Sequence, residues 1–367
     1  MFICDKCKNS DSKYIGYKNN QPYCRKCILL KTKEFENKKY DQCHLIKAAI
    51  SYSLTSTQQT ASNKILSFVK KGQSVLVNAV CGAGKTELMY ATMEYFLNQG
   101  KKVGFCIPRK DVVIEIYQRL KKDYPSISIV SVYGSHTQEL DGQIIVLTTY
   151  QLYRYQQHFD LLILDEADAF PYYNAYFLKR STKGIIVYLS ATFTKKFLKD
   201  IKNHVEVNRR FHQHDLPIPQ IKLCFSFQFL KTLTIYLNKF NRESKQVLIF
   251  VPTTKIGKEL SKKLNIPFVY SNDNQKQRII QQFKLHQIHF LITTTILERG
   301  ITIEDVQVIV YKANHFLFDF KTLVQISGRV GRKAKHPDGN IIFISNKKTH
   351  AMKLCIQTLK AKNATHA

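Results

Sequence analysis

Short apolar runs recur along the chain from about residue 47, and stretches with helical spacing separate them. In the first half these runs are rich in Val, Ile and Leu, and they cover residues 75–80, 103–107, 127–132, 144–148, 161–165 and 185–190. The runs are almost wholly apolar, whereas a strand with one solvated face alternates apolar and polar positions. The pattern therefore predicts α/β units whose parallel strands are covered by helices on both faces.

The pattern pauses at residues 212–220, HQHDLPIPQ, where two prolines and little periodicity indicate a linker. It restarts with runs at residues 247–251, 268–270, 290–294, 306–311 and 341–344. A chain of 367 residues also exceeds what one hydrophobic core usually holds. We therefore predict a first domain at residues 47–211, a linker at 212–220 and a second domain at 221–367, in tandem and with a cleft between them.

The block before residue 47 contains four cysteines in two pairs and ends in a Lys-rich tail. Cys4 and Cys7 form one pair, Cys24 and Cys27 form the other, and 16 residues separate the pairs. This spacing is typical of a tetrahedral Zn²⁺ site, in which four thiolates leave no open position for catalysis. We predict a structural zinc module at residues 1–46, and four unligated buried cysteines are the alternative.

Lys and Arg outnumber Asp and Glu by 56 to 27, which gives the chain a formal net charge of +29. A field of this sign attracts polyanions, either nucleic acid or an anionic membrane surface. Because the basic residues are spread along the whole chain, the alternative is that they solvate ordinary helix faces. No apolar run approaches the ~20 residues that span a bilayer, and the first residues lack the layout of a signal peptide. We expect a cytoplasmic protein, with peripheral binding at the inner face of the cytoplasmic membrane left open.

A glycine-rich turn lies between the first predicted strand and a stretch that suits a helix up to Asn98. Its sequence is AVCGAGKT, and its glycines let backbone N–H groups close around phosphate oxygens at a helix N-terminus. Lys85 is expected to neutralise the β- and γ-phosphates of ATP, and Thr86 to offer its hydroxyl to Mg²⁺. The first position is Ala where a strict phosphate loop has Gly, and a tight structural turn is the alternative. The predicted ATP contacts of this loop are Ala79, Val80, Cys81, Gly82, Ala83, Gly84, Lys85 and Thr86.

Two carboxylates end a buried strand later in the same half, in the sequence LLILDEAD. Ligands bind at the carboxyl ends of strands in open α/β sheets. Asp165 is expected to hold Mg²⁺ and Glu166 to orient the attacking water, and an acidic helix start is the alternative. Ser190, Ala191 and Thr192 end the next strand. We expect the Ser190 and Thr192 hydroxyls to sense the acid pair, although Ser and Thr are also common in turns.

Two arginines of the second half, within QISGRVGR, are candidates for the same reaction. Arg329 and Arg332 are three residues apart, one helical turn, so both are expected to face one way. Arg suits a bidentate grip on phosphate oxygens, and two glycines in the segment disfavour the alternative, a solvated basic helix. Gln325 opens the segment and is a candidate for coupling. We expect these arginines to complete the site when ATP is bound by the first domain, so that binding closes the cleft and hydrolysis reopens it.

Candidate contacts to a nucleic-acid backbone follow other predicted strands. Arg109 and Lys110 come just past the run at residues 103–107, where two cations can meet phosphate groups. A second contact loop is expected at residues 293–300, which also follow a strand. The remaining candidates are Thr148, Thr149, Arg154 and Thr294.

The order of these motifs from about residue 54 to 345 resembles that of superfamily 2 helicases. The resemblance implies two tandem RecA-like domains, an adenine-reading role for Gln58 and a nucleotide contact at Gly300. Two features depart from the DEAD-box RNA helicases. Gln325 stands where those proteins usually have His or Tyr, and residues 298–302, ERGIT, lack the carboxylate that they carry after Arg-Gly. Both departures are more similar to the DNA helicase PriA.

A more specific resemblance is to the ComFA family, the competence ATPases of transformable Gram-positive bacteria. It rests on AVCGAGKTE, TTYQLYRY, LDEADAFPYY, LSATF, residues 210–219 and the four-cysteine block. The resemblance implies a cytoplasmic ATPase, stimulated by single-stranded DNA, that helps to draw transforming DNA through a membrane channel. The partners it implies are single-stranded DNA, the ComEC channel, ComFC and DprA, and the cofactors are ATP, Mg²⁺ and Zn²⁺.

Two other functions stay open from the sequence. One is a PriA-like helicase for repair or replication restart, which the shortness of the chain disfavours. The other is a non-motor clamp in which ATP only locks a zinc-containing module on nucleic acid, and the presence of Glu166 with both arginines argues against it. An RNA substrate is disfavoured by the two departures from DEAD-box proteins.

Overall fold

The computed structural model describes residues 2–4, 9–18, 20–25, 40, 45–134, 136–168, 181–193, 201–271, 273–294 and 303–365. The chain forms two compact units. The first comprises Met1–Ala79 and Gly84–Val207, and the second comprises Asn208–Ala367 together with the loop residues Val80–Ala83. The expected domain bounds at residues 46, 211 and 220 stay predictions.

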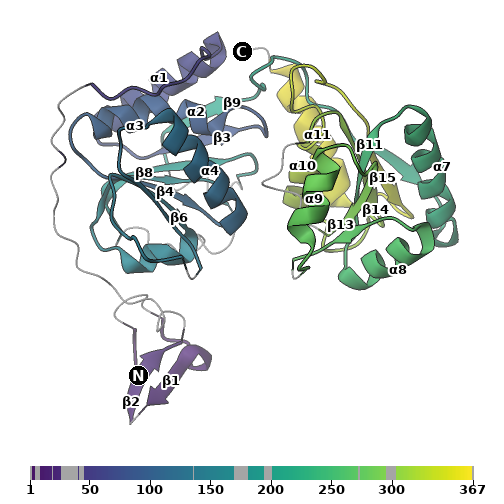
Figure 1. Ribbon diagram of the computed structural model, residues 1–367, viewed down its shortest axis with the longest axis horizontal. Coiled ribbons are helices and arrows are strands. Elements are labelled where there is room, and N and C mark those ends of the chain that lie inside the picture. Colours follow the sequence, from purple (N-terminus) through teal and green to yellow (C-terminus); the bar gives the residue numbers. More distant parts are fainter. Residues whose placement is uncertain are drawn as a thin grey trace. The chain divides into compact units, whose positions relative to one another are not determined.

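The first unit is built on a seven-stranded parallel sheet of order β5-β6-β4-β7-β8-β3-β9 (Figure 1). Its strands are β3 (Val75–Ala79), β4 (Val103–Ile107), β5 (Ile129–Val132), β6 (Ile144–Thr148), β7 (Phe159–Leu164), β8 (Thr182–Ser190) and β9 (His204–Val207). The helical segments are α1 (Ser56–Lys70), α2 (Lys85–Leu88), α3 (Tyr90–Leu97), α4 (Lys110–Asp123) and η2 (Thr149–Arg154). The central strands β4 and β7 are buried along nearly their whole length, as their apolar sequences predicted.

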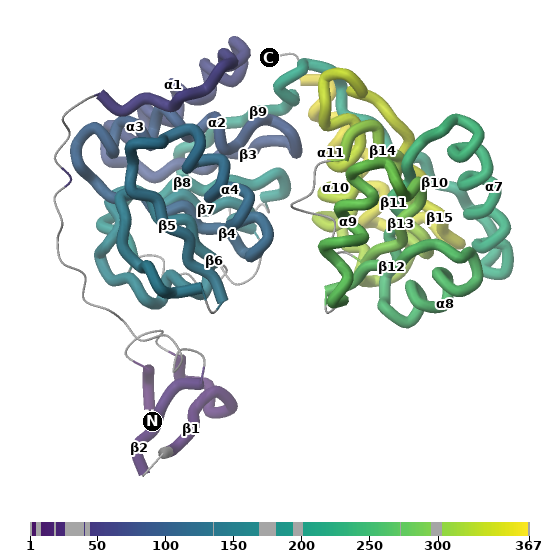
Figure 2. Tube along the Cα trace, in the orientation of Figure 1, coloured from purple at the N-terminus to yellow at the C-terminus, as the bar shows by residue number. Residues whose placement is uncertain are grey.

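The second unit repeats this architecture with a six-stranded parallel sheet of order β10-β15-β14-β11-β13-β12 (Figure 2). Its strands are β10 (Gln220–Leu223), β11 (Gln246–Phe250), β12 (Phe268–Val269), β13 (Phe290–Thr293), β14 (Val306–Tyr311) and β15 (Ile341–Ser345). The helical segments are η4 (Ser226–Gln228), α7 (Phe229–Arg242), α8 (Thr254–Leu264), α9 (Lys276–Lys284), α10 (Phe320–Ser327) and α11 (His350–Ala364).

The two sheets share one strand order. When β10 is aligned with β3 and the following strands in sequence, the order β12-β13-β11-β14-β15-β10 corresponds strand for strand to β5-β6-β4-β7-β8-β3. The turn after β10 therefore has the same topological position as the phosphate loop after β3. Residues 224–228, CFSFQ, contain neither glycine nor a Lys-Thr pair, so this turn lacks the chemistry of a phosphate loop. Strand β9, which extends the first sheet beyond β3, has no counterpart beyond β10 in the described part of the second unit.

Strands β9 and β10 were not predicted from the sequence. Both lie at sheet edges, and each places a charged residue, Glu206 or Lys222, at an exposed position within a four-residue strand. These exposed charged positions interrupt the continuous apolar pattern by which the other strands, including the buried edge strand β5, were predicted.

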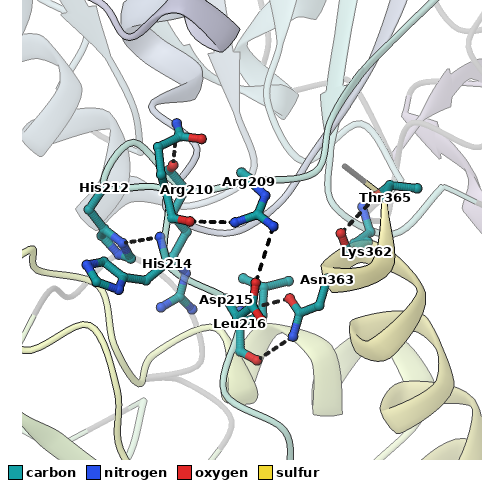
Figure 3. A network of polar contacts seen from close by, with 10 residues as sticks. Arg209, Arg210, His212, His214, Asp215, Leu216, Lys362, Asn363 and Thr365 are labelled. Carbon is teal, nitrogen blue, oxygen red and sulfur yellow. Dashed lines mark hydrogen bonds and ion pairs between the residues drawn. The ribbon is translucent and has the colours of Figure 1, made fainter. Parts of the chain in front are cut away.

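The segment between β9 and β10, from Asn208 to Pro219, contains no helix or strand. Figure 3 shows that polar contacts hold it within the second unit. The backbone N–H of Leu216 donates to Asn363 Oδ1 at 2.8 Å, and Asn363 Nδ2 donates to the Leu216 carbonyl at 3.0 Å. The Arg209 guanidinium lies 3.5 Å from the Asp215 carboxylate. The segment is thus tied to α11 by paired hydrogen bonds.

The N-terminal block contains one antiparallel hairpin of β1 (Ile15–Lys18) and β2 (Gln21–Cys24). Cys4 and Cys24 are each buried to 5% exposure and pack together with Phe2. The other two predicted zinc ligands, Cys7 and Cys27, lie outside the described residues. Within the described part of the chain, no group of three or more His, Cys, Asp or Glu side chains is arranged to hold a metal ion. The hairpin therefore brings two of the four cysteines together without forming a site from described residues alone.

Candidate nucleotide and nucleic-acid sites

The phosphate loop has the backbone that its glycines predicted. Gly82 and Gly84 have φ angles of 87° and 79°, in the left-handed region that favours glycine. Gly84 is the N-cap of α2, and a Cβ there would lie 2.5 Å from Gln58 Nε2. Lys85 and Thr86 open the helix, which is interrupted at Met89 before it continues as α3. Glycine is therefore required at Gly84 both by the turn and by the close approach of a neighbouring side chain.

Gln58 lies beside this loop and also holds the start of α1. Its Oε1 accepts from the Thr55 backbone N–H at 3.0 Å, and Thr55 Oγ1 accepts from the Gln58 N–H at 3.3 Å, a capping box. The side chain is 5% exposed and reaches Gly84 with its amide end. The glutamine that the family resemblance singled out is thus positioned at the phosphate loop, and its reading of adenine stays a prediction.

The four loop residues that group with the second unit have specific partners there. The Cys81 thiol donates to Gln325 Oε1 at 3.2 Å, and the Cys81 carbonyl accepts from Arg210 Nε at 3.1 Å. A Cβ at Gly328 would lie 2.5 Å from Cys81 Cβ, so this glycine permits the approach. Gln325, predicted as a coupling residue, is therefore in direct contact with a residue of the phosphate loop.

The acid pair follows β7, and Asp168 links it to the end of β8. The Ser190 and Thr192 hydroxyls both donate to the Asp168 carboxylate, the latter at 2.7 Å, and the Thr192 N–H donates to Ser190 Oγ at 3.0 Å. Asp168 is 5% exposed. The two hydroxyls thus contact the last residue of the DEAD sequence, and their sensing of Asp165 and Glu166 stays a prediction. Asp168 itself was not among the predicted site residues.

Glu166 has an unusual backbone for a residue of its type. Its φ is 54°, in the left-handed region, and its N–H donates to Asp165 Oδ1 at 2.9 Å. This conformation costs a non-glycine residue about 1–2 kcal/mol. Such strain often accompanies functional positions, where it sets the direction of a side chain.

The three motifs meet at one edge of the first sheet. Strand β8 pairs with β3 on one side and with β7 on the other, all parallel, so the phosphate loop, the Ser190–Thr192 turn and the acid pair follow neighbouring carboxyl ends. Adjacent strands lie about 4.8 Å apart, which places the loops after β3 and β7 on the order of 10 Å from each other. The Thr86 hydroxyl and the Asp165 carboxylate are oxygen ligands of the kind that Mg²⁺ prefers. The residues present therefore fit a nucleotide with its magnesium ion.

Arg329 and Arg332 do not lie on a helix, contrary to the prediction. Helix α10 ends at Ser327, Arg329 lies in the turn that follows, and Arg332 comes directly after that turn. Gly331 causes the change of direction: its φ is 67°, and a Cβ there would lie 2.0 Å from the Pro337 carbonyl oxygen. Arg332 Nε donates to the Gly328 carbonyl at 2.8 Å, whereas Arg329 is only 3% exposed. That the two side chains face one way stays a prediction.

Arg210 is a further buried arginine beside this turn. Its guanidinium donates to the Val330 carbonyl at 2.7 Å and to the Gly331 carbonyl, and it is 1% exposed. Burial lowers the pKa of Arg210 to about 10, so the group stays charged at neutral pH. His212 Nε2 also contacts the Gly331 carbonyl, at 3.0 Å. The sequence signal was the Arg–Phe–His stretch at residues 210–212, which resembles the ComFA family but assigns no role to the arginine by itself.

The predicted nucleic-acid contacts of the first unit lie at two adjacent strand ends. Arg109 caps α4 after β4, Thr148 ends β6, and Ile107 pairs with Thr148 in the sheet. Lys110 begins α4, and Arg154 ends η2. Thr149 is buried, with 1% exposure. In the second unit Thr294 follows β13, whereas Gly300 lies outside the described residues.

Aromatic residues beside these cations were not predicted. Lys110 Nζ lies 5.1 Å from the ring centroid of Tyr133, and Tyr133 stacks on His136 with centroids 4.8 Å apart. Tyr150 in η2 is half exposed. Aromatic side chains next to Lys and Arg are typical of surfaces on which nucleic-acid bases stack. The signal was present in the sequence as Tyr at two strand ends, but only the fold places them near the basic residues.

Two family models match the chain. Residues 51–195 match the "Type III restriction enzyme, res subunit" model, and residues 227–334 match the "Helicase conserved C-terminal domain" model. Together with the two RecA-like sheets and the motifs at their edges, these matches define an ATP-hydrolysing, helicase-like enzyme of superfamily 2.

The relatives give the particular family. The chain is 32% identical to competence protein ComFA of Bacillus subtilis over 96% of this chain and 83% of that protein. It is 34% identical to competence protein ComFA of Streptococcus pneumoniae over 93% of this chain and 85% of that protein. The chain belongs to the ComFA family.

Solved structures of helicases share the fold. Saccharomyces cerevisiae Dbp5 bound to RNA and ADP BeF3 matches with a TM-score of 0.67 and 18% identity, over 85% of this chain and 88% of that one. Mycobacterium smegmatis helicase Lhr bound to single-stranded DNA and AMP-PNP matches with a TM-score of 0.60 and 15% identity, over 84% of this chain and 50% of that one. At these identities the likeness concerns the fold alone.

Proposed function

We propose that the chain is a DNA-dependent ATPase that drives single-stranded transforming DNA into the cytoplasm during competence. The observation that carries the proposal is the meeting of three motifs at the carboxyl ends of β3, β8 and β7, in a member of the ComFA family. Such an edge is where open α/β sheets bind their ligands.

In the proposed reaction, backbone N–H groups around Gly82 and Gly84 bind the phosphates, and Lys85 neutralises charge on the β- and γ-phosphates. Thr86 and Asp165 would hold the magnesium ion, which would supply charge stabilisation on the phosphate oxygens. Glu166 orients the attacking water, and Arg329 and Arg332 contribute positive charge to the transition state. Gln58 and Gly300 complete the nucleotide contacts.

Asp168 is proposed to connect this chemistry to movement. It receives hydrogen bonds from Ser190 and Thr192 and comes two residues after Glu166 in the chain. A shift of the acid pair would therefore alter the hydrogen bonds that Asp168 receives from Ser190 and Thr192, the two residues on either side of Ala191. Gln325, which contacts Cys81, is proposed to report the state of the phosphate loop in the second unit.

For DNA binding we propose the basic and aromatic strand-end surface of the first unit: Arg109, Lys110, Thr148, Arg154, Tyr133 and Tyr150. Cations there would bind the phosphate backbone without reading sequence, and the rings would stack on bases. Thr294 remains a candidate contact, whereas Thr149, predicted as a contact, is buried and its side chain is not proposed as one. ComFC, DprA and the ComEC channel are proposed partners on the ground of family membership. None of the described helices combines the length and apolar character needed to cross a bilayer.

A structural Zn²⁺ at Cys4, Cys7, Cys24 and Cys27 also remains a proposal. What supports it is the spacing of the four cysteines and the shared burial of Cys4 and Cys24 beside the β1–β2 hairpin. Cysteine thiolates are suitable zinc ligands, and such a small block gains most of its stability from the metal. Elemental analysis of the purified protein, compared with Cys24→Ser, measures whether zinc is bound.

The proposed function is tested by steady-state ATP hydrolysis with single-stranded DNA, duplex DNA and RNA in parallel. Single-stranded DNA is expected to stimulate most strongly. Lys85→Ala and Glu166→Gln are expected to lower kcat by at least about 10²-fold, because each removes a group that acts on the phosphates or the water. Equal stimulation by RNA would contradict the DNA preference, and unchanged turnover in both variants would contradict the site.

A further inference from the structure

The free edge of the second sheet has an exposed apolar surface that the ATPase site does not explain. Strand β10 is the end strand, paired with β15 alone in the described part of the unit. Leu223 at its carboxyl end is 52% exposed, and Phe225 and Phe227 in the following turn are 70% and 82% exposed. The two phenyl rings stack on each other with centroids 5.7 Å apart and an interplanar angle of 6°. Three large apolar side chains exposed together mark an interaction site more often than isolated ones do.

The backbone of this edge is suited to accept another strand. The Cys224 N–H donates to the Ser345 carbonyl of β15, so the backbone N–H and C=O groups of Cys224 point toward β15. Because neighbouring residues of a strand face opposite sides, Ile221 and Leu223 direct their N–H and C=O groups to the edge away from β15. The Phe225 N–H donates to Gln228 Oε1 at 3.2 Å, so Leu223 is the last residue of this edge whose backbone can pair with an added strand.

The first unit has a strand at the corresponding edge. There β9 pairs in parallel with β3, the strand whose place β10 takes in the second sheet. In β9, Val205 and Val207 are buried and Glu206 between them is exposed. A strand of alternating apolar and acidic residues is thus the kind of segment that completes this architecture in the same chain.

The charge around β10 favours an acidic partner. Residues 216–242 and 341–367, which include β10, η4, α7, the end of β15 and α11, contain no Asp or Glu. Lys222, Lys231, Lys347 and Lys348 are exposed there, and Asn346 Nδ2 donates to Ser226 Oγ at 3.3 Å, which holds the two turns together. The same charge, and the +29 of the whole chain, disfavours a second copy as the occupant.

We propose that the β10 edge, with Phe225 and Phe227 as apolar anchors, binds an extended acidic segment of a partner polypeptide as an added β-strand. Main-chain hydrogen bonds to Ile221 and Leu223 would supply the pairing, and the exposed rings would receive apolar side chains of the segment. Lysines at an edge commonly prevent strand addition, but exposed phenylalanines beside the edge have the opposite effect.

The probe for a test is a fluorescein-labelled peptide of about eight residues that alternates valine and glutamate, a typical strand length. Binding to the full chain is measured by fluorescence anisotropy at about 150 mM salt, where exposed charges are screened beyond ~8 Å. The expected result is saturable binding that Leu223→Pro and the double variant Phe225→Ser/Phe227→Ser each weaken at least about tenfold. Pro at residue 223 removes an outward N–H and the exposed Leu223 side chain, and keeps the Cys224 bond to β15.

Controls separate strand pairing from charge attraction. Ile235→Ser removes another exposed apolar side chain, from α7, that is 58% exposed, and is expected to leave binding unchanged. A peptide with every amide N-methylated keeps its charge and side chains but cannot form a ladder from either edge, and is expected not to bind. Stimulation of ATP hydrolysis by single-stranded DNA is expected to be the same in wild type and all variants, which distinguishes this proposal from the ATPase function.

Three outcomes would overturn the proposal. Equal affinity of wild type, Leu223→Pro and the double Phe variant would show general charge attraction. Loss of affinity for oligo(dT) in the double Phe variant, with peptide binding intact, would assign the surface to nucleic acid. A wild-type dimer in sedimentation velocity that Leu223→Pro dissociates would assign the edge to a second copy.

Discussion

Glu166 combines a proposed catalytic role and backbone strain in a single residue. Its carboxylate is proposed to orient water, and its φ of 54° is one that glycine adopts at no steric cost. The buried strand β7 and the hydrogen bond from the Glu166 N–H to Asp165 hold the residue in this state. Glycine would suit the backbone at this position better, but only glutamate supplies the carboxylate that the proposed reaction needs.

Replacing Glu166 by glycine is expected to raise the free energy of unfolding while it abolishes turnover. Relief of the left-handed strain contributes about 1–2 kcal/mol, and the greater entropy of glycine in the unfolded chain offsets roughly 0.5–1 kcal/mol of it. Glu166→Gln is the matched control, since it also lacks the carboxylate but keeps the strain. Urea unfolding followed by circular dichroism compares the two, and equal stabilities would show that the strain is not released.

His158 connects stability to pH through its surroundings. Burial, followed by the nearby Lys102 charge, lowers its pKa from 6.5 to about 4, against an opposing effect of Asp141. The unfolded chain therefore takes up a proton between about pH 6.5 and 4 that the folded chain does not. The contribution of His158 to the free energy of unfolding is full above pH 6.5 and falls as the pH drops toward 4.

The expected loss is at most about 3 kcal/mol, the equivalent of the shift in pKa. It is measured as the difference between wild type and His158→Gln in urea titrations at several pH values. The variant keeps the 2.8 Å bond from Lys102 to Asp141 but lacks the titrating ring, so its curve should be flatter. Parallel curves for the two proteins would contradict this assignment.

At the scale of elements, the apolar runs predicted the central strands well. β4, β6 and β14 have the bounds that were expected, because strands covered on both faces are apolar throughout. The edge strands β9 and β10 were not predicted because they contain exposed charged positions. The end of α10 was not predicted because the turn after it depends on the close approach of Gly331 to Pro337. In the candidate site, sequence motifs indicated the phosphate loop and the acid pair. The hydrogen-bond partners of Asp168 and Arg210 are distant in the sequence, so no motif spacing predicts these contacts.

The capping box of α1 permits a test that separates structure from nucleotide binding. Thr55→Ala removes one hydrogen bond of the box and is expected to cost about 1 kcal/mol of stability, with KM for ATP unchanged. Gln58→Ala is expected to cost a similar amount and also to raise KM, because its amide lies beside Gly84. Thermal unfolding and ATP hydrolysis are measured on both variants, and equal KM values would leave Gln58 with a capping role only.

At the scale of the whole molecule, the net charge of +29 is expected to strengthen binding to a polyanion such as DNA. A single strand of DNA releases bound counterions as its phosphates are neutralised. The distribution of Lys and Arg over both units means that total charge alone does not locate the binding surface.

The logarithm of the DNA association constant is expected to fall linearly with the logarithm of salt concentration, by about 0.7 per neutralised phosphate. Arg109→Ala and Lys110→Ala are each expected to reduce this slope by about that amount. Lys353→Ala, an exposed change on α11, serves as the control and should leave the slope as it is. Anisotropy titrations with oligo(dT) measure all four slopes, and a flat wild-type curve would remove the electrostatic basis of the proposal.

The shared strand order of the two sheets bears on how many nucleotides the enzyme is expected to bind. In each sheet the turn after the first strand, β3 or β10, holds the position of a phosphate loop. The turn after β10 has exposed phenyl rings there instead of glycines. We therefore expect one bound nucleotide per polypeptide, so that any coordination between several ATP sites would require assembly of separate molecules.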